Sequence, residues 1–190
     1  AWIKTSTSMS DNGIAGKSGT DNGGYELVAI SSRRVRFQMS NTYVDTTLNL
    51  SDNGWHHIVG VYDSTNMTIY FDGIGQNSIV SSAPVTTSQA FEVGRYWNSD
   101  TTAFNGTIDE VRIYNRALSP TEILGLYNGS TPRNGLVLEH IYSLGNANDL
   151  SGYGNNGTPI NGPVFIPNAC TDTCTVPIGC IAPVCNFVVT

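Results

Sequence analysis

One segment, residues 104–119 with the sequence FNGTIDEVRIYNRALS, restricts the fold of this chain more than any other. Read as a strand, it alternates between two faces, and Val111 and Ile113 share an apolar face with Asp109. A carboxylate on a buried face is costly unless a cation or several hydrogen-bond donors satisfy it, so Asp109 is the first candidate functional residue. The opposite face carries residues that we expect to be solvated: Glu110, Arg112, Tyr114 and Arg116.

A short helix is predicted directly after this strand. Ser119 is suited to the N-cap, Pro120 to the first helical position, and Glu122 completes a capping box. The apolar stripe that would pack on the sheet consists of Ile123, Leu124 and Tyr127, and Gly129 ends the helix.

The remainder of residues 1–129 shows many short alternating segments separated by turn signals. Residues 34–39 alternate between charged or polar and apolar side chains, and residues 55–62 and 67–71 also read as strands. Turn signals recur about every eight to twelve residues, which is typical of a β-sandwich or jelly roll.

The sequence from Gly106 to Ile123, GTIDEVRIYNRALSPTEI, resembles the closing strand and helix of laminin-G-like domains with the concanavalin A-like jelly roll. Upstream, WHHIVGVYD at residues 55–63 and MTIYFDG at residues 67–73 are similar to the family's central hairpin, at the expected distance. The resemblance covers most of residues 1–129. It implies an all-β concanavalin A-like jelly-roll sandwich with one short helix.

Residues 130–166 resemble the opening strand and loop of the same family, although they follow the jelly roll in this chain. They could begin a second domain of a tandem array, or they could complete the first domain's own sheet as a circular permutation would. Closure is favoured because an unpaired central strand position exposes backbone donors and acceptors. We therefore expect residues 135–143 to pair antiparallel with residues 107–116, within the chain or by exchange with a neighbouring copy.

Net charge and cysteine usage limit the partners and the compartment. The net charge of -6 and the pI of about 4.8 argue against nucleic acid and anionic membranes, and no apolar run is long enough for membrane insertion. The tail, residues 167–190, contains all the cysteines. Two disulfides are favoured over a zinc site, which predicts an extracellular or cell-surface protein; the residues are Cys170, Cys174, Cys180 and Cys185.

Calcium is the cofactor that the sequence favours. Asp109 would bind it together with Asp149, Asn155 and carbonyl groups of the loop at residues 146–155, since calcium takes six to eight oxygen ligands. Many members of the resembled family have a similar arrangement, and the ion would be structural. The alternative is that Asp109 accepts backbone hydrogen bonds and that no ion binds.

The sequence gives little support for catalysis. Asp109 and Glu110 are neighbours in a strand and diverge, and neither a run of the type E-x-D-x-E nor G-x-S-x-G occurs. His56 and His57 also diverge, so they are expected to be packing residues and not ligands of one metal ion.

Exposed aromatic residues beside amides are suited to holding sugar rings, and residues 95–98 have this character. Trp97 could instead cover the end of the core. The sequence therefore predicts a non-catalytic extracellular adhesion or recognition module for a glycan or extracellular glycoprotein. The alternative is a structural subunit of a surface filament or coat, assembled from copies by strand exchange. The candidate ligand-binding residues are Arg95, Tyr96, Trp97 and Asn98.

Overall fold

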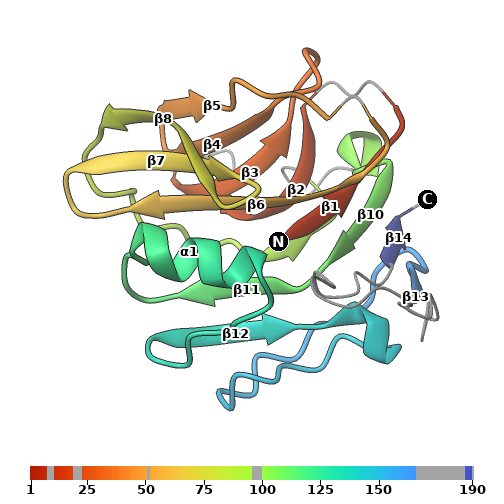
Figure 1. The fold of residues 1–190 in the computed structure, drawn as a ribbon. Helices are drawn as coiled ribbons and strands as arrows, with labels where there is room; N and C mark the ends of the chain where they lie inside the picture. Colours follow the sequence, from red (N-terminus) through yellow and green to blue (C-terminus); the bar gives the residue numbers. More distant parts are fainter. Residues whose placement is uncertain (8–10, 19–22, 51, 96–99, 166–186, 190) are drawn as a thin grey trace, which may run out of the picture.

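The structure is a computed structural model that describes residues 1–7, 11–18, 23–50, 52–95, 100–165 and 187–189. Its strands form three antiparallel sheets, two of which face each other as a sandwich (Figure 1). The larger sheet contains, in spatial order, β13 (Val164–Phe165), β14 (Phe187–Val189), β10 (Gly106–Asp109), β1 (Trp2–Lys4), β6 (Trp55–Tyr62), β7 (Asn66–Phe71) and β8 (Ile74–Val80). The second sheet contains β5 (Thr42–Asp45), β4 (Val35–Met39), β3 (Gly24–Ala29), β2 (Asn12–Ser18) and β9 (Glu92–Val93).

The core lies between these two sheets. Alternation along β7 turns Met67, Ile69 and Phe71 inward, and alternation along β4 turns Val35, Phe37 and Met39 toward them. The intervening positions of β3, β4 and β5 therefore lie on the outer face of the five-stranded sheet. The expected all-β sandwich is confirmed.

Helix α1 (Pro120–Tyr127) lies on the outer side of the larger sheet, and its predicted capping box is present. The N–H of Glu122 donates to Ser119 Oγ (3.3 Å), and the N–H of Ser119 donates to Glu122 Oε2 (2.9 Å). Ile123 and Leu126 pack against β6, while Leu124 is 46% exposed. The predicted stripe was therefore wrong at Leu124, because the sheet lies under the side of the helix that Ile123 and Leu126 share.

The strand expected over residues 107–116 is broken at Glu110, whose φ of 49° separates β10 from β11 (Val111–Tyr114). The prediction that Arg112 is solvated was wrong. Its side chain is 8% exposed and binds Glu110 (2.8 Å) and Glu139 (2.9 Å), because β12 (Leu136–His140) covers one side of β11.

The third sheet is the pair β11–β12, in which Val111 is opposite His140 and Ile113 is opposite Leu138 (Figure 1). The predicted antiparallel return of residues 135–143 is thus present within the same chain. It involves residues 111–114, whereas residues 107–109 pair with β1. Strand exchange was the basis of the filament alternative, and in this structure the strand is already paired in its own chain. The division into residues 1–129, 130–166 and 167–190 stays a prediction.

Two short 3-10 turns, η1 (Asp100–Thr102) and η2 (Tyr142–Leu144), complete the described elements. Within the described part of the chain, no helix is both long and apolar enough to span a membrane.

Candidate functional site

A line of polar residues crosses the outer face of the five-stranded sheet, and strand register brings its members together. Gly16 on β2 pairs with Glu92 on β9 and with Glu26 on β3. Glu26 pairs with Gln38 on β4, and Gln38 pairs with Tyr43 on β5. We call this line, Glu92, Gly16, Glu26, Gln38 and Tyr43, the polar row. Residues directly opposite each other share a face, so one ligand on this face could contact Tyr43 together with Gln38, whereas Gly16 and Glu26 are buried.

Tyr43 is the exposed aromatic end of the polar row. Tyr43 is 51% exposed, and the guanidinium carbon of Arg36 lies 3.7 Å from the centroid of its ring. Two hydrogen bonds to Asp45, of 2.8 and 3.0 Å, fix Arg36 in turn. The ring is therefore held in one orientation while half of its surface remains in solvent.

Glu26 is the buried centre of the polar row. It is 5% exposed and accepts a hydrogen bond of 2.5 Å from Ser18 Oγ. Burial raises the pKa of Glu26 to about 7, although the Ser18 hydrogen bond opposes this. Gly16 beside it leaves no room for a side chain, because a Cβ there would lie 2.3 Å from the Cβ of Glu26.

Arg95, the first residue of the predicted ligand-binding segment, lies at the other end of the polar row. Arg95 Nε lies 3.4 Å from Glu92 Oε1, directly after β9. Tyr96, Trp97 and Asn98 lie outside the described residues, so their role stays a prediction. The polar row itself was missed from the sequence. The polar alternation in residues 34–39 was a signal of this row, but the sequence does not show how neighbouring strands pair.

Asp109, the first predicted calcium ligand, is 1% exposed. Its Oδ1 accepts hydrogen bonds from the backbone N–H groups of Glu110 (2.7 Å) and Tyr142 (2.8 Å). Burial raises the pKa of Asp109 to about 6, and these donors oppose the shift. This arrangement matches the alternative prediction, in which backbone donors satisfy the Asp109 carboxylate.

Asp149, the second predicted ligand, is surrounded by donors. Its Oδ1 accepts the N–H groups of Glu139 and Ser151, both at 2.9 Å. Its Oδ2 accepts Ser151 Oγ (2.8 Å) and the N–H of Asn155 (2.9 Å). Desolvation opposes ionisation, yet the backbone hydrogen bonds from Glu139, Ser151 and Asn155 lower the pKa of Asp149 to about 2.

In this structure, the side chains of all three predicted ligands make hydrogen bonds within the protein. The side-chain amide of Asn155 donates to Val137 O (2.9 Å), and Leu150 N donates to Glu139 O (2.9 Å), so the loop lies along the edge of β12 away from β11. Asp109 contacts η2 instead. Among the residues that the structure describes, no three His, Cys, Asp or Glu side chains gather as a metal site. Calcium stays a prediction from the resemblance, and the backbone donors at Asp109 favour the alternative in which no ion binds.

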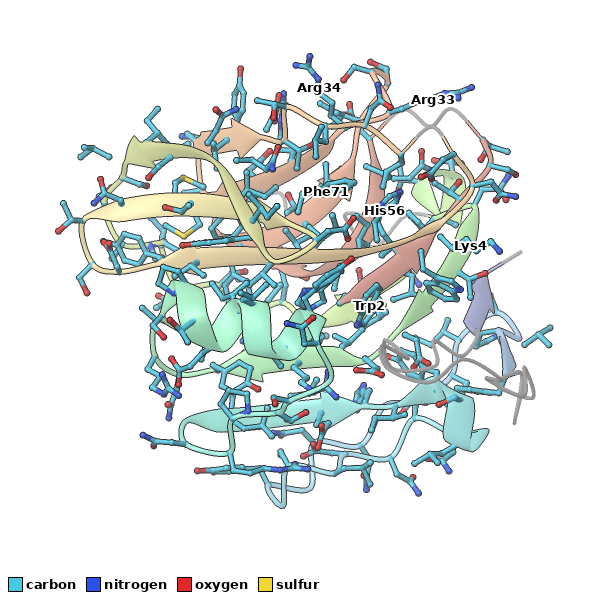
Figure 2. All side chains as sticks on the ribbon, viewed as in Figure 1. Trp2, Lys4, Arg33, Arg34, His56 and Phe71 are labelled. Atoms are coloured by element: carbon cyan, nitrogen blue, oxygen red, sulfur yellow. The ribbon has the colours of Figure 1, made fainter. Side chains whose placement is uncertain are left out.

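His56 and His57 point to opposite faces of β6, as the sequence predicts. The His56 ring lies between Asp52 and Asp72, at 2.9 Å from each, and 4.5 Å from the Phe71 ring (Figure 2). His57 is 2% exposed beneath α1, and burial lowers its pKa well below the usual value. The His57 ring therefore packs beneath α1, whereas the His56 ring also binds two carboxylates. The predicted disulfide residues, Cys170, Cys174, Cys180 and Cys185, lie outside the described residues.

The fold and the comparison with known families agree on the class of protein. The family model for the concanavalin A-like lectin/glucanases superfamily, of the laminin G type, matches residues 1–124. The chain therefore belongs to this superfamily.

Individual relatives are more distant. The human neuronal pentraxin receptor is 24% identical over 150 residues, which cover 72% of this chain and 30% of that protein. A putative carbohydrate binding protein from Bacteroides ovatus has a similar structure, with a TM-score of 0.64 and 19% identity over 86% of this chain and 47% of that one. Domain 4 of AbnA, a GH43 extracellular arabinanase from Geobacillus stearothermophilus solved with arabinotriose, has a TM-score of 0.54 and 22% identity over 66% of this chain and 63% of that one. The chain spans less than two thirds of each of these relatives, and the structural similarities concern the fold alone.

Proposed function

We propose that this chain is a non-catalytic recognition module that binds a glycan on the polar row. The observation that carries the proposal is the fixed, half-exposed ring of Tyr43 beside the amide of Gln38. An aromatic ring can stack on the apolar face of a sugar, while an amide exchanges hydrogen bonds with its hydroxyl groups.

The comparisons support this class of ligand. The Geobacillus domain was solved with arabinotriose, and the Bacteroides protein is described as putatively carbohydrate-binding. Since fold alone does not fix function, the proposal depends on the polar row of this chain. We place the module at an extracellular or cell-surface location, in keeping with the extracellular arabinanase.

Binding without turnover is part of the proposal. Hydrolysis of a glycosidic bond uses two carboxyl groups that both reach the scissile linkage. In the polar row, Glu26 is buried and bound by Ser18, and Glu92 lies against Arg95. Neither carboxyl group is presented as an exposed acid or base, so a bound oligosaccharide should be recovered intact.

The test is a glycan array followed by titration calorimetry with the glycan that binds most tightly. Tyr43→Ala should weaken binding by about 10-fold, the equivalent of roughly 1.4 kcal/mol lost from one stacking contact. The matched control is Tyr153→Ala, because Tyr153 is 67% exposed and lies in the loop on the far side of β12. Equal affinity of the wild type and Tyr43→Ala would remove the polar row from the account.

A further inference from the structure

One imidazole ring joins two separate turns of the chain. His56 Nε2 lies 2.9 Å from Oδ1 of Asp52, in the connection between β5 and β6, and His56 Nδ1 lies 2.9 Å from Oδ2 of Asp72, in the turn between β7 and β8. An ionised carboxylate only accepts hydrogen bonds, whereas a neutral imidazole has a single N–H group. Both hydrogen bonds can therefore form together only when His56 is an imidazolium that donates from both nitrogens.

The other neighbours of the ring carry no charge toward it. The Phe71 ring lies against His56, with centroids 4.5 Å apart, and Ile3 is the residue opposite His56 on β1. Lys4 lies on the other face of β1 from Ile3, and the exposed side chain of Arg33 points away from the ring (Figure 2). In the described part of the chain, the charges that face the ring are therefore the two carboxylates.

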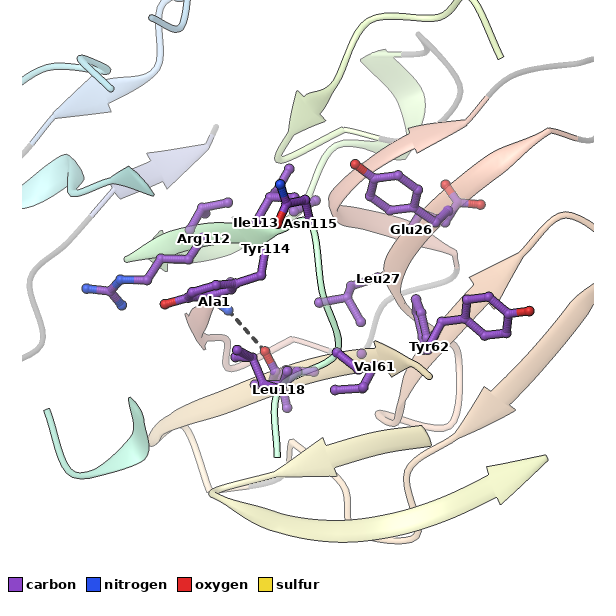
Figure 3. Close-up of a pocket in the computed structure, with 18 of the residues that line it drawn as sticks. Ala1, Glu26, Leu27, Val61, Tyr62, Arg112, Ile113, Tyr114, Asn115 and Leu118 are labelled. Carbon is purple, nitrogen blue, oxygen red and sulfur yellow. Dashed lines mark hydrogen bonds between the residues drawn. The ribbon is translucent and has the colours of Figure 1, made fainter. Parts of the chain in front are cut away.

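The ring is also separate from the cavity of the molecule. This cavity, of about 660 Å³, lies between the two sheets and is lined among others by Leu27, Tyr62 and Ile113 (Figure 3). Neither His56 nor its two carboxylates belong to the lining. The protonation of His56 therefore depends on its own turn partners and not on what fills the cavity.

Asp72 is fixed independently of the ring. Its Oδ1 accepts the N–H of His57 (2.7 Å), and its own N–H donates to His57 O (2.8 Å), so the residue is bound to β6. Positive φ angles at Asp72 (50°) and Gly73 (79°) are the geometry of a tight two-residue turn between antiparallel strands. Asp72 therefore stays beside Nδ1 in either protonation state of His56.

Asp52 depends on the ring much more. Its side chain is 63% exposed, and its Oδ1 accepts the N–H of Gly54 (2.8 Å), within the same turn, as well as the hydrogen bond from His56. The chain before this turn is anchored separately, because Leu50 is buried and its N–H donates to Arg33 O (2.7 Å). The part of the connection that the ring controls is therefore the short turn from Asp52 to Gly54.

We propose that His56 is a pH-sensitive tie, which as an imidazolium holds the turn from Asp52 to Gly54 against the β7–β8 turn and which releases that turn on losing a proton. The neutral ring keeps its N–H on Nδ1, where Asp72 is fixed. The lone pair of Nε2 then faces the Asp52 carboxylate, and two acceptors at hydrogen-bonding distance repel each other, so Asp52 turns into solvent.

The direction of the switch follows from the surroundings of the ring. Burial opposes the charge of His56, but the hydrogen bonds to Asp72 and Asp52 raise its pKa above the usual value. The folded chain thus holds this proton more tightly than the unfolded chain. The stability that the tie contributes is complete below the ordinary histidine pKa and is lost as the pH rises through the raised pKa.

NMR of the isotope-labelled chain between about pH 5 and pH 9 tests the proposal. The ring signals of His56 report its protonation, and the amide of Gly54 reports the turn. As His56 loses its proton, hydrogen exchange at Gly54 should rise by at least about 10-fold beyond the ordinary base-catalysed increase. Exchange at Gly54 that does not follow the titration of His56 would overturn the proposal.

Two matched variants isolate the carboxylate. Asp52→Asn should lower the pKa of His56, because a neutral amide attracts the imidazolium less. Asp63→Asn is the control, since Asp63 is also an exposed turn residue, whose Oδ1 accepts the N–H groups of Thr65 (2.9 Å) and Asn66 (2.7 Å), and it should leave that pKa unchanged. The same pKa of His56 in wild type and Asp52→Asn would contradict the tie. Glycan binding is not part of either measurement, so the two proposals can fail separately.

Discussion

At the scale of single residues, Asp109 shows how a buried carboxylate is satisfied in this protein. The sequence placed it on an apolar face, where a cation or several donors must compensate it. In the structure the donors are the backbone N–H groups of Glu110 and Tyr142. A structural ion is therefore not required at this position.

Calcium should consequently leave stability unchanged. After treatment with a chelator, added calcium should shift the thermal midpoint of the wild-type chain by less than about 1 °C, because the acceptor positions of Asp149 are already filled. Differential scanning calorimetry provides the measurement. A calcium-dependent rise that disappears in Asp149→Asn would show that these residues bind the ion after all.

Glu26 predicts a pH dependence. Its pKa is raised from 4.5 to about 7 in the folded chain, so the folded state holds its proton more tightly than the unfolded state. The stability contributed by the neutral carboxyl group is complete below about pH 4.5 and is lost as the pH rises through 7.

Glu26→Gln should remove this loss. Relative to wild type, the variant should gain roughly 2 kcal/mol in free energy of unfolding at pH 8, and the difference should shrink toward zero at pH 4. Urea unfolding at both pH values measures this. A difference between variant and wild type that is the same at pH 4 and pH 8 would show that folding does not shift the pKa of Glu26.

At the scale of elements, α1 is stabilised by a local signal. Ser119→Ala should lower the free energy of unfolding by about 1 kcal/mol because the N–H of Glu122 loses its acceptor. Ser119→Asp, which keeps an acceptor at the N-cap, should lose much less. Chemical denaturation of the two variants measures both losses of free energy of unfolding. Equal losses would mean that an acceptor at the N-cap does not stabilise α1.

The elements also show which features a sequence can predict. The helix start was predictable because the capping box lies within four residues, and the strands were predictable from alternation. The exposure of Leu124 was not, because it depends on where the sheet lies beneath α1. The polar row was not predictable either, since Gly16, Glu26 and Gln38 meet only through register between strands. The loop at residues 146–155 was predicted to lie beside Asp109, but its hydrogen bonds hold it along β12.

At the scale of the whole molecule, the sandwich separates two surfaces. The polar row lies on the outer face of the five-stranded sheet, whereas β11, β12 and α1 lie at the other side of the molecule (Figure 1). The pairing of β11 with β12 and recognition on the polar row therefore involve different strands. A change in one surface should leave the other intact.

The most direct test of glycan recognition is the position of the bound sugar. Amide chemical shifts of the isotope-labelled chain, recorded during titration with the best glycan from the array, would map it. The account predicts shifts concentrated at Gly16, Glu26, Gln38 and Tyr43, with none at Tyr153. Shifts confined to the loop at residues 146–155, with the polar row unaffected, would contradict it.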